Sequence, residues 1–100
     1  MKTKFLHLHN NQKVKPVHTV SGLSDGPIQL FVYSNDNKWY LQKEASFRGK
    51  HFSVDVSFGD TASPSGAPFE LVAVNTDKRM ASPLDILPKG CQTGLKVFKA

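Results

Sequence analysis

The segment Phe52–Phe58 constrains the fold more than any other part of this chain. Phenylalanine or valine occupies every second position, and serine or aspartate occupies the positions between them. Successive side chains of a β-strand point to opposite faces of a sheet, so this alternation gives the strand one apolar and one polar face. The pattern is typical of an antiparallel strand that has its apolar face against a core and its polar face in water.

Similar short strands recur along the chain, and residues that favour turns separate them. The expected strands are Phe5–His9, Val14–Ser21, Ile28–Ser34, Lys38–Gln42, Phe52–Phe58, Phe69–Asn75 and Leu95–Lys99. Pro16 interrupts the second strand, and proline has no backbone N–H to donate, so that half of the strand belongs at an edge or a bulge. The number and spacing of these segments predict an all-β fold, a seven-stranded antiparallel β-sandwich.

Helix is expected in at most one place, a short turn over residues 82–87. Ser82 would accept a hydrogen bond at the start of such a turn, and Pro83 suits the first helical position. The rest of the stretch from Lys78 to Thr93 is expected to be a long connection. A chain of 100 residues suits one domain, so residues 1–100 are expected to form a single sandwich.

Several short motifs resemble those of bacterial immunoglobulin-like and fibronectin-type-III-like β-sandwich modules. They are Val20-Ser-Gly22, Trp39-Tyr-Leu-Gln42, Gly49 ahead of the alternating strand, and Phe69-Glu-Leu-Val-Ala73. The resemblance covers nearly the whole chain and implies an accessory or adhesive module. The chain departs from antibody-type domains, because Cys91 is its one cysteine and Trp39 lies too late for the buried position on the third strand.

The chain lacks the residue patterns of common catalytic and metal sites. It contains no G-x-S-x-G elbow, no phosphate-binding loop and no H-E-x-x-H motif. A lone cysteine such as Cys91 is more often a small packed hydrophobe than a nucleophile. His7 and His9 would share one face of a strand, but two imidazoles without a third ligand do not make a metal site. We therefore expect no catalytic residues, no cofactor and no metal.

Two groups of side chains are candidates for ligand binding. Tyr33, Trp39 and Tyr40 would form a platform for a sugar ring or for a partner's apolar side chain. The alternative is that Trp39 caps the core while Tyr40 faces solvent, since neighbours in a strand point opposite ways. Arg48 and Lys50 lie in a basic turn that suits phosphates or an acidic partner, although such turns are often only solvated.

These observations predict a non-catalytic binding or structural module. A protein partner, within a larger assembly, is the leading expectation, and an open sheet edge would bind it by strand addition. The candidate edges are the first strand, the strand around Pro16, and Lys38–Gln42. One alternative is a carbohydrate-binding module that uses the three aromatic residues.

A third hypothesis is a basic nucleic-acid-associated domain, suggested by the net charge of +5. The lysines are spread along the sequence without a dense cluster, so nucleic acid is not the expected partner. No apolar run reaches the ~18 residues that a membrane-spanning helix needs. If Met1 is the native start, the lack of a convincing signal peptide favours a cytoplasmic protein.

Overall fold

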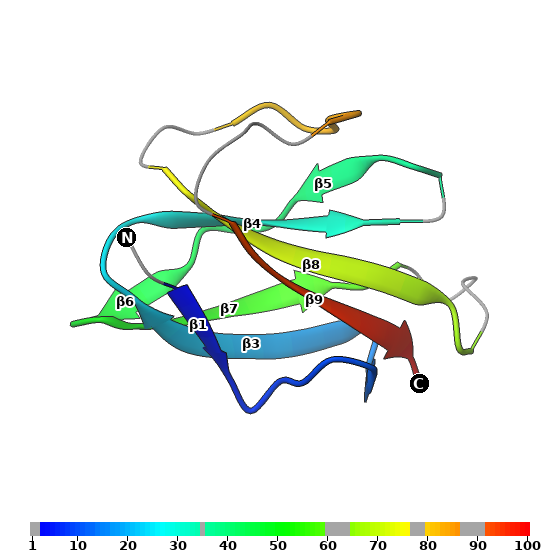
Figure 1. The fold of residues 1–100 in the computed structure, drawn as a ribbon, viewed down its shortest axis with the longest axis horizontal. Helices are drawn as coiled ribbons and strands as arrows, with labels where there is room; N and C mark the ends of the chain where they lie inside the picture. Colours follow the sequence, from blue (N-terminus) through cyan, green and yellow to red (C-terminus); the bar gives the residue numbers. More distant parts are fainter. Residues whose placement is uncertain (1–2, 35, 60–64, 77–79, 87–91) are drawn as a thin grey trace.

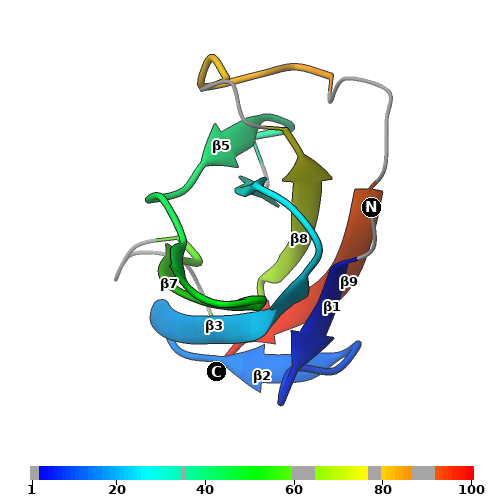
Figure 2. The same ribbon diagram turned by 90° about the vertical axis from the view of Figure 1, so that its left-hand side faces the viewer.

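Two β-sheets pack face to face in the computed structural model, which describes residues 3–34, 36–59, 65–76, 80–86 and 92–100 (Figures 1 and 2). Within these ranges the chain forms nine strands and no helix. The strands are β1 (Thr3–Leu6), β2 (Gln12–Val14), β3 (Val17–Ser24), β4 (Ile28–Tyr33), β5 (Trp39–Leu41), β6 (Ser46–Arg48), β7 (His51–Ser57), β8 (Pro68–Asn75) and β9 (Gln92–Lys99). The all-β sandwich expected from the sequence is confirmed, whereas the expected number of seven strands is wrong.

The two sheets differ in size and in strand order. The smaller sheet has four strands in the order β1-β3-β7-β6, and the larger has five in the order β2-β9-β8-β4-β5. Neighbouring strands are antiparallel except for β2 and β9, which run parallel. β4 lies between β5 and β8, as its apolar sequence predicts for a central strand.

The core lies between the inner faces of the sheets. The apolar residues of the alternating segment, Phe52, Val54, Val56 and Phe58, are confirmed as buried, and Phe69 and Leu71 of β8 join them in the core. None of the six exposes more than 5% of its surface. Two of the phenylalanines, Phe58 directly after β7 and Phe69 of β8, meet edge to face across the sandwich with their ring centroids 6.0 Å apart. Each such buried side chain contributes roughly 1.5–3 kcal/mol to stability, so this cluster is the main stabilising element of the fold.

The N-terminal strands differ from the sequence prediction, because the chain crosses from one sheet to the other. β1 ends at Leu6, and His7 and Asn11 then adopt left-handed backbone angles, with φ of 59° and 66°. The alternation expected through His9 therefore stops, and His7 and His9 do not share a strand face. Pro16 lies between β2 and β3, so the single strand expected over Val14–Ser21 is two strands in different sheets.

The second strand absent from the sequence prediction is β6, which pairs with β7 in a hairpin. Arg48 is paired with His51, and Gly49 and Lys50 form the turn between them. Gly49 has φ of 62°, and a positive φ at the first position of a two-residue loop is a requirement that glycine meets most easily. All three residues of β6 are exposed, so no burial pattern marks this strand in the sequence.

The short helical turn expected over residues 82–87 is not formed in its described part. Residues 82–86 contain no helix, and Leu84 forms an isolated antiparallel bridge with Trp39. Leu87, the last residue of the expected turn, lies outside the described residues.

Gly22 allows β3 to continue to Ser24, beyond Ser21, where the sequence predicted this strand to end. A Cβ atom at Gly22 would lie 2.2 Å from the backbone oxygen of Lys4 and 2.6 Å from the ring of Phe52. Glycine is therefore required here so that β1 and the Phe52 ring approach the backbone of β3 closely.

The substitution Gly22→Ala is expected to destabilise the fold by about 2–3 kcal/mol, because the new methyl group overpacks a contact with backbone. Gly94→Ala is the matched control. Its Cβ would meet a Val72 methyl carbon at 3.2 Å, and this side chain needs to move by only a few tenths of an ångström. Urea unfolding measures both changes, and an equal loss of stability in the two variants would contradict the role of Gly22.

Candidate binding surface

The outer face of the five-stranded sheet carries a second, smaller hydrophobic cluster. Three of its residues point away from the main core and are nevertheless buried: Phe31 of β4, and Val72 and Val74 of β8. The side chains that cover them are Trp39, Leu41, Met80 and Leu84. In Figures 1 and 2 the segment of residues 80–86 lies outside β5, on the side away from the four-stranded sheet.

Backbone hydrogen bonds fix this covering segment to the edge of the sheet. The Trp39 N–H donates to the Leu84 carbonyl at 2.7 Å, and the Leu84 N–H donates to the Trp39 carbonyl at 2.9 Å. The Leu41 N–H donates to the Ser82 hydroxyl at 3.0 Å. The edge expected to be open over Lys38–Gln42 is therefore closed at two of its residues. A partner cannot add a strand there without displacing this segment.

A row of four side chains crosses the outer face beside this cluster. Trp39 on β5 is paired with Tyr33 on β4, Tyr33 with Glu70 on β8, and Glu70 with Lys96 on β9. We call these four residues the Trp39 row. The rings of Tyr33 and Trp39 are in contact, with centroids 4.7 Å apart and planes tilted by 52°, and both residues are half-buried.

The hairpin loop between β4 and β5 holds both tyrosines. The Tyr33 hydroxyl donates to Oδ1 of Asn37 at 3.1 Å, and the Tyr40 hydroxyl donates to the carboxylate of Asp36. The hydrogen bond to Asp36 is the main reason why the pKa of Tyr40 lies above its ordinary value, because the carboxylate stabilises the protonated phenol. These two hydrogen bonds hold the tyrosine side chains in one orientation.

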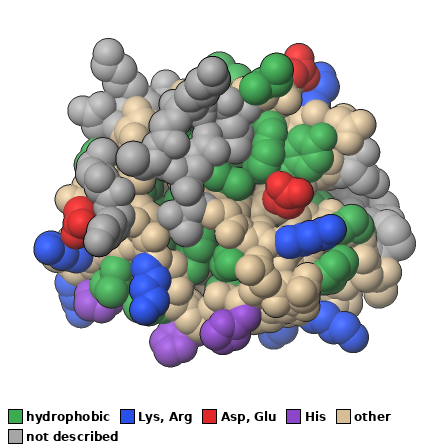
Figure 3. Space-filling view, in the orientation of Figure 1, with side chains coloured by type: hydrophobic (Ala, Val, Ile, Leu, Met, Phe, Trp, Pro, Cys, Tyr) green, Lys and Arg blue, Asp and Glu red, His purple; other side chains and the backbone are tan. Residues whose placement is uncertain are grey.

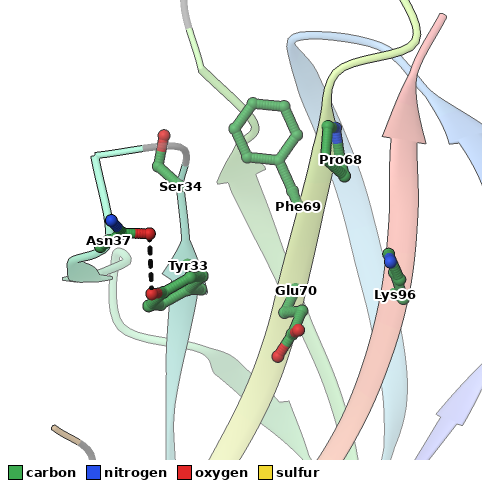
Figure 4. A pocket seen from close by; sticks show the side chains of 7 residues that line it. All are labelled: Tyr33, Ser34, Asn37, Pro68, Phe69, Glu70 and Lys96. Carbon is green, nitrogen blue, oxygen red and sulfur yellow. Dashed lines mark hydrogen bonds between the residues drawn. The ribbon is translucent and has the colours of Figure 1, made fainter.

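A recess of about 210 Å³ adjoins the row at the end of β4 and the start of β8. Figure 4 shows Tyr33 and Asn37 on one side of it, with Glu70 and Lys96 on neighbouring strands on the other. Pockets for small-molecule ligands usually measure about 300–1,000 Å³, so this recess is too small for one. It has room for a single side chain of a partner or a substituent of a sugar.

The five residues predicted to bind a ligand are divided among three places. Tyr33 and Trp39 lie together in the Trp39 row. Tyr40 lies on the opposite face of β5, paired with the core residue Val32. Arg48 and Lys50 lie on the β6–β7 hairpin of the other sheet, where Lys50 forms a surface ion pair with Asp25 at 3.5 Å.

Sequence reasoning missed Glu70 and Lys96. Their positions depend on the register of β8 with β9, and a long connection joins these two strands. The sequence did contain an indication of the apolar outer face beside them, because Val72 and Val74 make β8 apolar on both faces.

No three histidine, cysteine, aspartate or glutamate side chains of the described residues come close enough to hold a metal ion, and Cys91 lies outside those residues. In the same part of the chain no helix has the length and hydrophobicity to cross a bilayer. No family model, curated protein or solved structure matches this chain.

Leu84→Ala is expected to uncover the outer cluster. It should destabilise the fold by about 2 kcal/mol and shift the fluorescence of Trp39, the single tryptophan, to longer wavelength as water reaches the indole. Ile86→Ala is the matched control, because Ile86 lies on the same segment and is 82% exposed. Equal spectra and stabilities for the two variants would show that Leu84 does not cover Trp39.

Proposed function

We propose that this chain is a non-catalytic binding module with an immunoglobulin-like fold, and that it binds a protein partner through the Trp39 row. The observation that carries the proposal is the contact between the Tyr33 and Trp39 rings on the outer face of the five-stranded sheet. The strand order, the rigid setting of the rings and the neighbouring charges support it.

The strand order supports an immunoglobulin-like arrangement. Immunoglobulin domains of the constant type place their first, second, fifth and fourth strands in one sheet and their third, sixth and seventh in the other. When β2 and β5 are left out, the four-stranded sheet β1-β3-β7-β6 and the remaining strands β9-β8-β4 follow the same order. The motifs that resemble bacterial immunoglobulin-like modules add to this support.

Aromatic side chains with fixed orientations favour protein recognition. Tyrosine and tryptophan are enriched at the centres of protein interfaces, where they bury large areas. Packing against the outer cluster holds the Trp39 side chain, and the hydrogen bond to Asn37 holds the Tyr33 hydroxyl. Binding therefore costs little side-chain entropy, which leaves more of the contact energy available for affinity.

Glu70 and Lys96 add charges of opposite sign to the same row. A partner with the complementary pair of charges would be oriented by them, whereas a partner with the reversed pair would be repelled. The row thus combines an aromatic contact with a means of selecting one orientation.

The ring geometry favours a protein over a carbohydrate. A sugar ring stacks on a flat, open aromatic face, but the planes of Tyr33 and Trp39 are tilted by 52° and the rings pack on each other. The adjoining recess accepts one projecting side chain of a partner. Carbohydrate binding at this surface is therefore an alternative outcome of the test below.

A photocrosslinking phenylalanine analogue in place of Tyr33 should capture a protein partner in extracts of the cells that express this chain. The same analogue in place of Val17, which is 60% exposed on the other sheet, should capture much less. Equal capture at the two positions would contradict the proposal, and a glycan-array signal without a protein partner would assign the surface to carbohydrate.

The double charge exchange Glu70→Lys with Lys96→Glu should weaken binding of the captured partner by about tenfold or more, because it reverses the charges that orient the complex. The exchange Lys43→Glu with Glu44→Lys is the control. It also preserves net charge, and it changes exposed residues between β5 and β6. Calorimetry measures both, and equal affinities would exclude the Trp39 row as the interface.

A further inference from the structure

The outer face of the four-stranded sheet contains a hollow of about 530 Å³. It lies on the opposite side of the sandwich from the Trp39 row, so its role is independent of the function proposed above. Its volume falls within the ~300–1,000 Å³ that small-molecule sites occupy. The hollow therefore has room for a small molecule.

The floor of the hollow is a row of serines. Ser46 of β6 is paired with Ser53 of β7, and Ser53 is paired with Ser21 of β3. Directly paired residues lie on one face of a sheet, so the three hydroxyl groups line the same surface. Their small side chains leave the space above the strands open, and each hydroxyl is able to donate a hydrogen bond.

Cationic and imidazole side chains surround this floor. Arg48 and His51 form the next pair along β6 and β7 on the same face, and His7 follows the end of β1 on the other side of the hollow. None of the described residues that line the hollow is acidic. Figure 3 shows histidine side chains together with lysine or arginine side chains along the lower edge of the molecule in this view.

Asp55 is the acidic group nearest to the floor along the strand. It lies two residues beyond Ser53 on the same face of β7, on the side away from His51, and its carboxylate accepts a hydrogen bond from Thr19 at 2.7 Å. An anion is therefore favoured at the end of the hollow where Arg48 and His51 lie, and disfavoured at the end near Asp55.

We propose that this hollow binds a phosphate or sulfate ester, with the Arg48 guanidinium and the serine hydroxyls holding its oxyanion. Arginine offers paired N–H donors that match two oxygens of a tetrahedral oxyanion, and hydrogen bonds between charged groups are the stronger ones. His51 and His7 add further N–H donors around the anion.

Leu6 indicates that the ligand is an ester rather than a free ion. It is paired with Ser21 on the same face of the sheet as the three serines, and it lines the hollow as a half-buried side chain. A free inorganic ion would leave this apolar side chain in water, whereas the carbon skeleton of an ester would cover it. The ligand class is therefore a small organic molecule that carries one phosphate or sulfate group.

Titration of the ¹⁵N-labelled chain tests the proposal by NMR. The probes are glucose 6-phosphate and glucose 6-sulfate, with inorganic phosphate and sulfate for comparison and chloride at equal ionic strength as the blank. Saturable shifts of the Ser53, Arg48 and His51 amides are expected, with the esters bound more tightly than the free ions. The order of affinity of the two sugar esters identifies the group that the hollow selects.

Arg48→Gln should weaken binding of the better ester about tenfold, the loss expected for one charge-assisted contact. Lys50→Gln is the matched control, because it removes the same charge from the same hairpin while Lys50 pairs with Asp25 outside the hollow. Spectra of both variants recorded without ligand check that each variant keeps the fold. Shifts that do not saturate, esters that bind more weakly than free ions, or equal losses in the two variants would overturn the proposal.

Discussion

Burial of β4 and β8 on both faces constrains this small sandwich more than any other requirement. Their inner side chains fill the core, where each strand meets the apolar face of the four-stranded sheet. Their outer side chains, Phe31, Val72 and Val74, need a second cover, because the outer face of a two-layer sandwich otherwise meets water. The chain supplies it by leading the connection between β8 and β9 back over β5, where Met80 and Leu84 complete the packing. A connection between strands thereby becomes part of the hydrophobic structure.

This cover also limits the part of the outer face that stays accessible. The segment of residues 80–86 closes the edge of β5 and packs with Trp39 against the outer cluster, whereas Tyr33 is only half-buried and the charged residues beside it are exposed. The Trp39 row begins beside the outer cluster and continues across the part of the sheet that this segment leaves accessible. The hollow above Ser21, Ser46 and Ser53 has a different origin, since small side chains there leave a polar face open. The two surfaces lie on opposite sheets and differ in chemistry, so the two ligands proposed above would not compete for one site.

The sequence predicted the features that depend on local pattern. The alternation at Phe52–Phe58 identified the core face of β7. The expected strands Ile28–Ser34 and Lys38–Gln42 correspond to β4 and β5, which pair Tyr33 with Trp39. It did not predict β6, whose three residues are exposed and therefore lack a burial pattern. It also ended the strand at Ser21 instead of Ser24, because the close approach of Lys4 that requires a glycine at position 22 depends on tertiary structure.

The candidate site was predicted only in part, for a related reason. Tyr33 and Trp39 are close in sequence, so a hairpin brings them together. Glu70 and Lys96 come from strands joined by a long connection, and their place in the row follows from a register that the whole sheet determines. The neighbours of Arg48 in the hollow were likewise unpredictable, because Ser21 and His7 reach it from strands far away in the sequence.

The parallel pairing of β2 with β9 has a consequence for the order of assembly. Gln12 is paired with Val97, so this contact closes a loop that contains most of the chain. Hairpins such as β6–β7 require only short loops, and loop closure becomes more costly in entropy as loops lengthen. We expect the N-terminal strands to dock last, onto sheets that have already formed. Until then, the outer edge of β9 presents unpaired backbone groups, so the half-folded chain is more prone to association with other chains than the finished domain.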